Sequence, residues 1–398
     1  MPWKAVSAMD HRVEFVRLAL AGGVSILELC GRFEISRETG HRLLRRYAAE
    51  GADGLADRSR RPHTSPGRVA AEMEARVVEL RGQHPAWGGR KLGRRLRDLG
   101  VSDVPSASTI TEILRRHGCL DAARSAQHRA YQRFERGQPN ELWQMDFKGH
   151  FAIGSGRCHA LTVLDDHCRY ALELRACGDE TEATVRGHLT RLFRRYGLPE
   201  AILADNGPPW GTAGHPEVRY TGLGVWLMLL GVGVRHGRPR HPQTQGKEER
   251  FHRTLDVEVL QHQRFADLPA CQVAFDKWQR IYNEERPHEA LGLAVPASRY
   301  RPSPRPFPAK LAAPDYAAGD AVRRVSVDGY LNFQGRLLKI SQAFGRQRVA
   351  LRPTATDGVW RVYFSRFAVA RFDLRTNEAV HQQSVRHVSE HLSAMSPV

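Results

Sequence analysis

Three acidic residues stand in settings that suit chemistry on phosphodiesters. Asp146 lies in the apolar run 142–147, Asp205 directly follows the apolar run 201–204, and Glu249 lies in a polar stretch. The apolar runs predict buried strands, and the polar stretch predicts a helix. Carboxylate oxygens are hard ligands that suit Mg²⁺ or Mn²⁺. Two such ions, about 4 Å apart, can activate an attacking oxygen and stabilise a leaving oxygen.

Neighbouring residues leave alternatives open. Asp165 and Asp166 also follow an apolar run, where a hairpin turn is a simpler role for them than metal binding. Glu248 precedes Glu249, and adjacent helix residues point about 100° apart, so only one of the two can face the metals. Gly207 and the two prolines after it predict an abrupt turn that fixes the Asp205 carboxylate at the rim of a sheet.

The elements around these acidic residues predict a catalytic domain over residues 140–300. Strand-like and helix-like segments alternate in the order 142–147, 159–164, 169–174, helix 180–196, strand 201–204, an insert at 222–230, strand 232–235, and helices 245–261 and 268–283. Three neighbouring strands followed by helix–strand alternation favour a mixed sheet flanked by helices. The α/β layout is that of a ribonuclease-H-like core.

Length and charge indicate a multidomain protein with a polyanionic partner. The chain has 398 residues, Lys+Arg 60 against Asp+Glu 43, and a formal net charge of +17. A solvated basic surface is the simpler explanation of charge alone. We find no apolar run long enough to span a membrane and no secretory leader pattern, so we expect a cytoplasmic, nucleoid-associated protein with no membrane partner. The six cysteines form no CxxC pair, and we expect reduced core residues.

Residues 1–62 predict a helix-turn-helix unit. Ser25 and Ser36 stand where they can cap two successive helices, with a turn after Gly31. In such a unit the second helix enters the DNA major groove, which nominates for DNA contact Arg37, Glu38, His41 and Arg42. An ordinary helical hairpin is the alternative.

Residues 63–120 predict a second helix-turn-helix unit. Its third helix begins after Ser106 and ends at Gly118, which makes available to DNA Ser108, Thr109, Glu112 and Arg115. Between the two units, an irregular basic segment can follow DNA phosphates or enter the minor groove through Arg58, Arg60 and Arg61. A solvated spacer is an equally good interpretation of this segment.

The remaining segments are connectors and a small β domain. We expect a basic linker at 121–139, a Pro-rich linker at 301–314, and a flexible tail at 379–398. Short alternating runs between 315 and 378 predict a small all-β barrel.

Four motifs in order carry a family resemblance. They are Trp143-Gln-Met-Asp-Phe, Asp205-Asn-Gly, the stretch 241–255, and the stretch 282–288. Residues 140–300 resemble the integrase core of bacterial insertion-sequence transposases, the DDE group related to retroviral integrases. The tandem helix-turn-helix units are similar to those of the same transposases. The spacing from Asp205 to Glu249 is longer than is usual in that family, which we interpret as an insertion at 211–221.

The resemblance implies specific roles. Asp146, Asp205 and Glu249 would be catalytic and would bind two Mg²⁺ ions per active site, with Mn²⁺ as a substitute and Asp146 bridging both ions. The family pattern Gly-Lys-x-Glu-Arg selects Glu249 over Glu248. Other residues of these motifs are candidates for DNA contact or, for the last two, for bracing the core: Lys247, Arg250, Arg286 and His288.

The sequence therefore predicts a DNA transposase. We expect it to bind double-stranded DNA, both element ends and target, as a homo-oligomer of at least two subunits. It would cleave the donor strand and join the resulting 3′-hydroxyl to target DNA. The alternative is a DNA-binding regulator whose core no longer cuts; a plain ribonuclease-H-like nuclease would have no need of tandem sequence-reading units.

Overall fold

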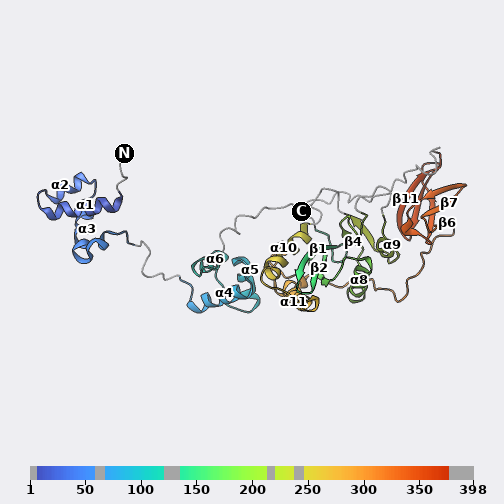
Figure 1. Cartoon of the computed structure of the whole chain (residues 1–398), viewed down its shortest axis with the longest axis horizontal. Helices are drawn as coiled ribbons and strands as arrows, with labels where there is room; N and C mark the ends of the chain where they lie inside the picture. Colours follow the sequence, from blue (N-terminus) through green and yellow to red (C-terminus); the bar gives the residue numbers. More distant parts are fainter. Residues whose placement is uncertain (1–6, 59–67, 121–134, 213–219, 237–245, 376–398) are drawn as a thin grey trace. The chain divides into compact units, whose positions relative to one another are not determined.

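The computed structural model describes residues 7–58, 68–120, 135–212, 220–236 and 246–375 (Figure 1). The chain divides into two compact units, Met1–Arg68 and Val69–Val398. Arg60, Arg61, the motif residues 241–245 and the predicted tail lie outside the described residues.

The first unit is a bundle of three helices. They are α1 Ala8–Ala21, α2 Ile26–Arg32 and α3 Arg37–Glu50, followed by a 3₁₀ turn at Gly51–Leu55. Ser25 accepts the Glu28 amide and Ser36 accepts the Thr39 amide, which confirms both predicted caps. Gly40 lets α3 approach α2 closely, because an added Cβ would lie 2.5 Å from the Cys30 sulfur.

A second three-helix bundle opens the other unit. It consists of α4 Ala71–Gln83, α5 Gly89–Asp98 and α6 Ala107–Arg116, packed around the buried Trp87. Ser106 caps α6 through the Thr109 amide, and the chain leaves that helix at Gly118 with φ +65°. Both predicted boundaries of α6 are therefore confirmed.

The predicted mixed sheet is present in the second unit. Its strands are β1 Trp143–Ile153, β2 Gly156–Asp165, β3 Ala171–Cys177, β4 Ala201–Ala204 and β5 Gly233–His236, in the order β3-β2-β1-β4-β5. The first three strands pair antiparallel, whereas β4 runs parallel to β1 and β5 parallel to β4. The ribonuclease-H-like α/β core is confirmed.

Helices cover the two faces of this sheet. α8 Glu182–Tyr196 and α9 Gly222–Leu229 pack on the face that carries Trp143 and Met145. α10 Gly246–Leu255 and α11 Leu268–Arg280 pack on the opposite face (Figure 1). Side chains alternate between the faces of a strand, so Asp146 faces the side of α10 and α11.

The C-terminal region is all-β. A four-stranded antiparallel sheet of order β11-β10-β9-β6 and a two-stranded sheet β7-β8 share one apolar core. The strands are β6 Ala321–Arg324, β7 Tyr330–Phe333, β8 Arg336–Lys339, β9 Arg348–Pro353, β10 Val359–Phe364 and β11 Phe367–Asp373.

The helix α9 follows the segment 211–221 that we interpret as an insertion, most of which lies outside the described residues. It is apolar all round, which is typical of a helix buried on every side. One side, with Leu223 and Trp226, packs on the mixed sheet, and the other, with Val225 and Met228, packs into the β domain. α9 therefore attaches the β domain to the core.

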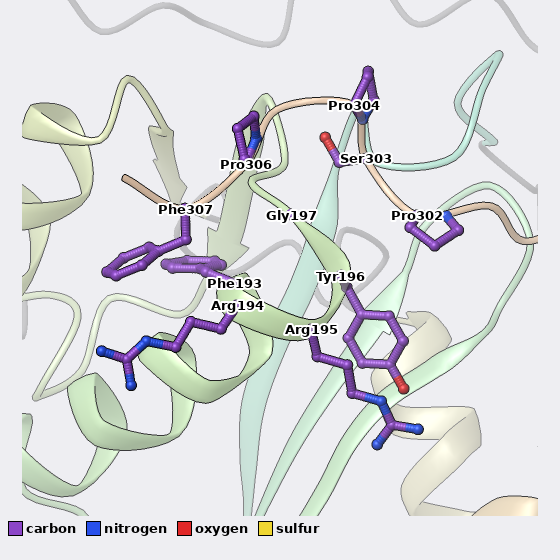
Figure 2. Close-up of a pocket in the computed structure, with 10 residues that line it drawn as sticks. All are labelled: Phe193, Arg194, Arg195, Tyr196, Gly197, Pro302, Ser303, Pro304, Pro306 and Phe307. Atoms are coloured by element: carbon purple, nitrogen blue, oxygen red, sulfur yellow. The ribbon is translucent and has the colours of Figure 1, made fainter. Parts of the chain in front are cut away.

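The Pro-rich segment after the core is partly docked rather than a free linker. The Ser303 amide donates to the Tyr196 carbonyl oxygen (2.7 Å), and the Phe307 ring packs against Phe193. Figure 2 shows this segment passing the end of α8, where it borders an open groove of about 370 Å³. Gly197, with φ +78°, lies beneath the Pro-rich segment, and a Cβ added to it would lie 2.6 Å from the backbone carbonyl oxygen of Ser303.

All six cysteines are free, and five of them are buried. Cys119 is partly exposed. The expectation of reduced core residues is confirmed for the buried five.

Candidate active site

The sheet register places two of the predicted carboxylates side by side. Gln144 on β1 lies opposite Leu203 on β4, and the strands are parallel. The same register two residues further along puts Asp146 opposite Asp205, which directly follows β4. Burial and the neighbouring Asp205 raise the pKa of the Asp146 carboxyl from 3.8 to about 7, and Glu180 adds to the effect.

The chain after β4 holds Asp205 in place. The Gly207 amide donates to Asp205 Oδ1 (3.0 Å), which makes a tight turn of the kind predicted from the sequence. His236 Nδ1 on β5 donates to the Asp205 backbone oxygen (2.7 Å). The turn and the β5 contact together fix the backbone of Asp205 at the end of the sheet.

The two neighbouring glutamates of α10 lie in different surroundings. Glu249 is 65% exposed, and its nearest cation is Arg253, 3.4 Å away on the next turn. Glu248 is only 1% exposed, and burial and then Asp146 raise its pKa well above the ordinary range. We expected Glu249 to face the metals; in this structure Glu248 is the residue turned toward Asp146.

The helical pattern explains this difference. Glu248, Phe251 and Leu255 fall on one buried stripe at positions i, i+3 and i+7. Glu249 lies one residue away from that stripe, on the side that leads to His252 at i+3. His252 Nδ1 is 4.0 Å from Asp146 Oδ2, so this side of α10 borders the carboxylate pair. A change of the Glu249 side-chain rotamer would be needed to bring its carboxylate toward them.

Thr162 on β2 joins the acidic groups to one another. Its hydroxyl lies 3.0 Å from the Asp146 backbone oxygen, 3.0 Å from Glu248 Oε2 and 2.9 Å from His252 Nε2. A hydroxyl carries one proton and cannot donate to all three. The raised pKa of Glu248 is consistent with a proton of its own, and burial lowers the pKa of His252 to about 4, which keeps it neutral.

These residues suit a divalent cation in part. Asp146 and Asp205 supply oxygen ligands, and burial together with the neighbouring negative charge of Asp205 raises the pKa of Asp146, a cost that a bound cation would relieve. Within the described ranges, no three His, Cys, Asp or Glu side chains already converge on a point that could hold a metal. The donor set therefore fits, but a third ligand from α10 must move to complete it.

Lys247 does not lie where we expected a DNA contact. Its ammonium is largely buried and pairs with the Asp166 carboxylate, while Gln144 also donates to that carboxylate (2.6 Å). Asp165 accepts the amide of Asn140 (2.7 Å) and forms the turn between β2 and β3 with Asp166. The structure thus gives Lys247 and the two aspartates a bracing role at the hairpin.

Arg286 and His288 also brace the core. Arg286 is 8% exposed and its Nε donates to Glu258 Oε1 (3.0 Å). His288 is buried against the ring of Tyr282, and burial lowers its pKa well below the ordinary range. Because a buried guanidinium cannot reach a DNA phosphate, the DNA contact expected of Arg286 is wrong for this conformation.

The residues expected to read DNA lie mainly on exposed helix surfaces. In α3 the exposed positions include Arg37, Glu38, His41 and Arg42, and in α6 they include Ser108, Glu112 and Arg115. Thr109 is half-buried and its hydroxyl contacts Ser106, so it acts in the cap. Arg250 is exposed on α10, whereas Arg58 pairs with Glu50 at the end of α3.

Sequence reasoning missed three residues around Asp146, namely Thr162, Glu180 and His252, and it set Glu248 aside in favour of Glu249. A signal for Glu248 was present, since it shares the apolar stripe of α10 with Phe251 and Leu255. Thr162 and Glu180 carry no such signal, because their approach to Asp146 depends on strand register and on the segment after β3.

Comparisons with protein families match most of the chain in separate segments. Residues 136–242 and 230–296 match integrase core domains, and residues 320–380 match the IS481 family transposase C-terminal domain. Residues 11–63 match a helix-turn-helix domain, and residues 39–114 match a homeodomain-like domain.

Curated relatives come from bacterial insertion elements. The chain is 28% identical over 231 residues to the insertion element IS407 protein of Burkholderia multivorans, covering 56% of this chain and 79% of that protein. It is 26% identical over 251 residues to the IS476 protein of Xanthomonas euvesicatoria, covering 61% and 69%. It is also 26% identical over 300 residues to the transposase InsD of IS2 in Escherichia coli, covering 71% and 93%.

Solved structures give only distant similarity. A chain of the simian T-cell lymphotropic virus intasome in complex with PP2A regulatory subunit B56 gamma has a TM-score of 0.38 at 16% identity, covering 72% of this chain and 91% of that one. The HTLV-2 integrase catalytic core domain in complex with magnesium has a TM-score of 0.28 at 19% identity, covering 37% and 90%.

The domain matches and the relatives define a DNA-cutting and DNA-joining enzyme with helix-turn-helix units and an integrase core. It is an insertion-sequence transposase with a core like that of retroviral integrases. None of the helices that the structure describes is both long and apolar enough to cross a membrane.

Proposed function

We propose that this transposase binds the terminal inverted repeats of its element, cleaves the donor strand and joins the 3′-hydroxyl to target DNA. The observation that carries the proposal is the placement of Asp146 on β1 opposite Asp205, which directly follows the parallel strand β4; burial and then Asp205 raise the pKa of Asp146 to about 7. Such a pair suits chemistry that depends on divalent cations.

The carboxylates of Asp146, Asp205 and Glu249 would hold two Mg²⁺ ions, or Mn²⁺ in their place. When bound, these ions would lower the barrier to in-line displacement at phosphorus. Asp146 and Asp205 present fixed oxygens from the sheet, and Glu249 would complete the set from α10. The same site would serve first water and then the 3′-hydroxyl as nucleophile.

The helix-turn-helix units would supply sequence recognition. The exposed residues of α3 and α6 would contact base edges and phosphates of the element ends. Because two ends must be joined to one target, at least two subunits would act together on DNA. We further propose that the protein works in the cytoplasm, on the nucleoid.

Asp205→Asn tests the proposal directly. The test DNA carries inverted repeats taken from the sequence that flanks the coding region, and strand cleavage and transfer are followed on gels in Mg²⁺. We expect loss of both reactions with nearly unchanged repeat binding. Asp267→Asn is the matched control, because asparagine keeps the cap of α11 that Asp267 provides. Metal-dependent strand transfer by Asp205→Asn would reject the assignment.

One observation favours the alternative of a regulator with an inactive core. Glu249 is exposed and no three-ligand group is formed among the described residues. A metal-dependent nicking assay on repeat DNA separates the two functions. A regulator would bind the repeats with the same specificity and leave both strands intact.

A further inference from the structure

Glu248 is a buried polar residue at the junction of β1, β2 and α10. Its Oε2 atom lies 3.0 Å from the Thr162 hydroxyl and 3.7 Å from His252 Nε2. Thr162 in turn contacts the backbone oxygen of Asp146 at 3.0 Å. The carboxyl group therefore connects α10 to the strand that carries Asp146.

The second oxygen of Glu248 has no hydrogen-bond partner in the described part of the chain. Oε1 is buried and unpaired, which ordinarily destabilises a folded protein. The remainder of the stripe is apolar, with Phe251 and Leu255, so leucine would pack at this position without such a penalty. A polar side chain at position 248 therefore destabilises the fold. This cost indicates a role for Glu248 at the neighbouring carboxylates of Asp146 and Asp205.

Glu248 cannot itself contact DNA, because it is 1% exposed. Glu249, the next residue, is exposed and free of any contact with Asp146 in this structure. The orientation of α10 about its axis therefore decides whether Glu249 can reach the carboxylate pair. Glu248 and His252 both contact Thr162 on β2, and Lys247 pairs with Asp166 after β2, so these polar contacts hold α10 in this orientation.

We propose that Glu248 is a positioning residue for the metal site. With Thr162 it holds α10 in the orientation from which the Glu249 side chain can turn toward the ions held by Asp146 and Asp205. This inference rests on the proposed function, since it assumes that the site binds divalent cations. It assigns a specific role to a residue that the family pattern Gly-Lys-x-Glu-Arg leaves open.

The test measures Mn²⁺ binding to the full-length protein by electron paramagnetic resonance, together with the unfolding temperature. Replacing a residue that orients a metal ligand through a hydrogen bond typically changes the metal affinity of the site 10- to 100-fold. We therefore expect Glu248→Leu to weaken Mn²⁺ binding by about 10-fold or more. Glu248→Gln should stay within about threefold of wild type, because its amide can keep the contact with Thr162.

Two further variants separate positioning from general stability. Val259→Ala removes buried apolar volume from the same helical region without touching Thr162 or Glu248, and should lower the unfolding temperature without changing Mn²⁺ affinity. Thr162→Val removes the hydroxyl and should weaken Mn²⁺ binding as Glu248→Leu does. If Glu248→Leu does not fold, the Mn²⁺ affinity of Thr162→Val tests the positioning role in its place.

The outcomes distinguish this inference from the proposed function. Wild-type Mn²⁺ affinity in folded Glu248→Leu and Thr162→Val, with binding lost in Asp205→Asn, would overturn the positioning role alone. Loss of binding in Glu248→Gln, with binding kept in Glu249→Gln, would show that Glu248 is itself a ligand and would also overturn it. Unchanged Mn²⁺ binding in Asp205→Asn would overturn the proposed function.

Discussion

Asp146→Asn should make the metal-free protein more stable at alkaline pH while it removes activity. In the folded protein burial and Asp205 raise the pKa of Asp146 from 3.8 to about 7. Because the pKa of Asp146 is higher in the folded than in the unfolded protein, its carboxyl contributes its full stabilisation below about pH 3.8. This contribution is lost as the pH rises through about 7. Asparagine has no charge to lose or gain, so the variant avoids this loss.

The size of the effect follows from the two pKa values. Their difference of about 3, at about 1.4 kcal/mol per pKa unit, corresponds to about 4 kcal/mol over the whole range. About 3 kcal/mol of this falls between pH 5 and pH 8. The Asp146 side chain is 24% exposed, and solvent screening lowers the expected value to about 2 kcal/mol. For a domain of 150 to 250 residues this corresponds to about 4 to 8 °C in unfolding temperature.

Scanning calorimetry of the full chain in a chelating buffer measures the effect. The transition of the unit that contains the core should move up in Asp146→Asn relative to wild type, by a margin that grows from pH 5 to pH 8. Added Mg²⁺ should reduce or reverse the difference, because ion binding stabilises only the wild-type protein. Asp267→Asn should follow wild type at every pH. Equal unfolding temperatures of Asp146→Asn and wild type at pH 8 would refute the electrostatic reasoning.

Three other predictions address the third carboxylate, DNA reading and the docked Pro-rich segment. Glu249→Gln should abolish strand transfer on repeat DNA while repeat binding persists; retained transfer would remove Glu249 from the site. Arg37→Ala should narrow the difference in affinity between repeat and unrelated DNA by about 1 to 3 kcal/mol, whereas Arg58→Ala should weaken both equally and reduce the salt dependence, as measured by binding titrations at several salt concentrations. Gly197→Ala should destabilise the core by about 2 kcal/mol or more, because φ is +78° and the added Cβ would meet the Ser303 oxygen; an unchanged unfolding temperature would contradict this.

Local sequence patterns were sufficient for the helix boundaries and for two of the carboxylates. Ser25, Ser36 and Ser106 cap the helices that they were expected to cap, since capping depends on residues only three positions apart. Asp205 directly follows β4, as the apolar run before it predicted, whereas β1 continues to Ile153 and places Asp146 inside the strand rather than at its end. Their pairing follows from a parallel register that adjacent strands of this core adopt.

Features that depend on tertiary packing could not be read from local patterns. Lys247 and Arg286 are basic residues in motifs associated with DNA, yet each is buried against an acidic partner that lies far away in the sequence. An isolated motif does not reveal whether a cation meets a phosphate or a buried carboxylate. The role of α9 in joining the β domain to the core was hidden for the same reason.

The orientation of α10 links these observations to catalysis. A helix can present only one of two adjacent residues to a given neighbour, and the apolar stripe with Phe251 and Leu255 turns Glu248 inward. That orientation leaves Glu249 exposed and paired with Arg253, whereas His252 lies beside the Asp146 carboxylate. A site arranged in this way would hold two carboxylates ready on the sheet and add the third only by a side-chain movement. Divalent cations, which relieve the repulsion among the acidic groups, would then favour the closed arrangement, and the site would be completed only when the ions are bound.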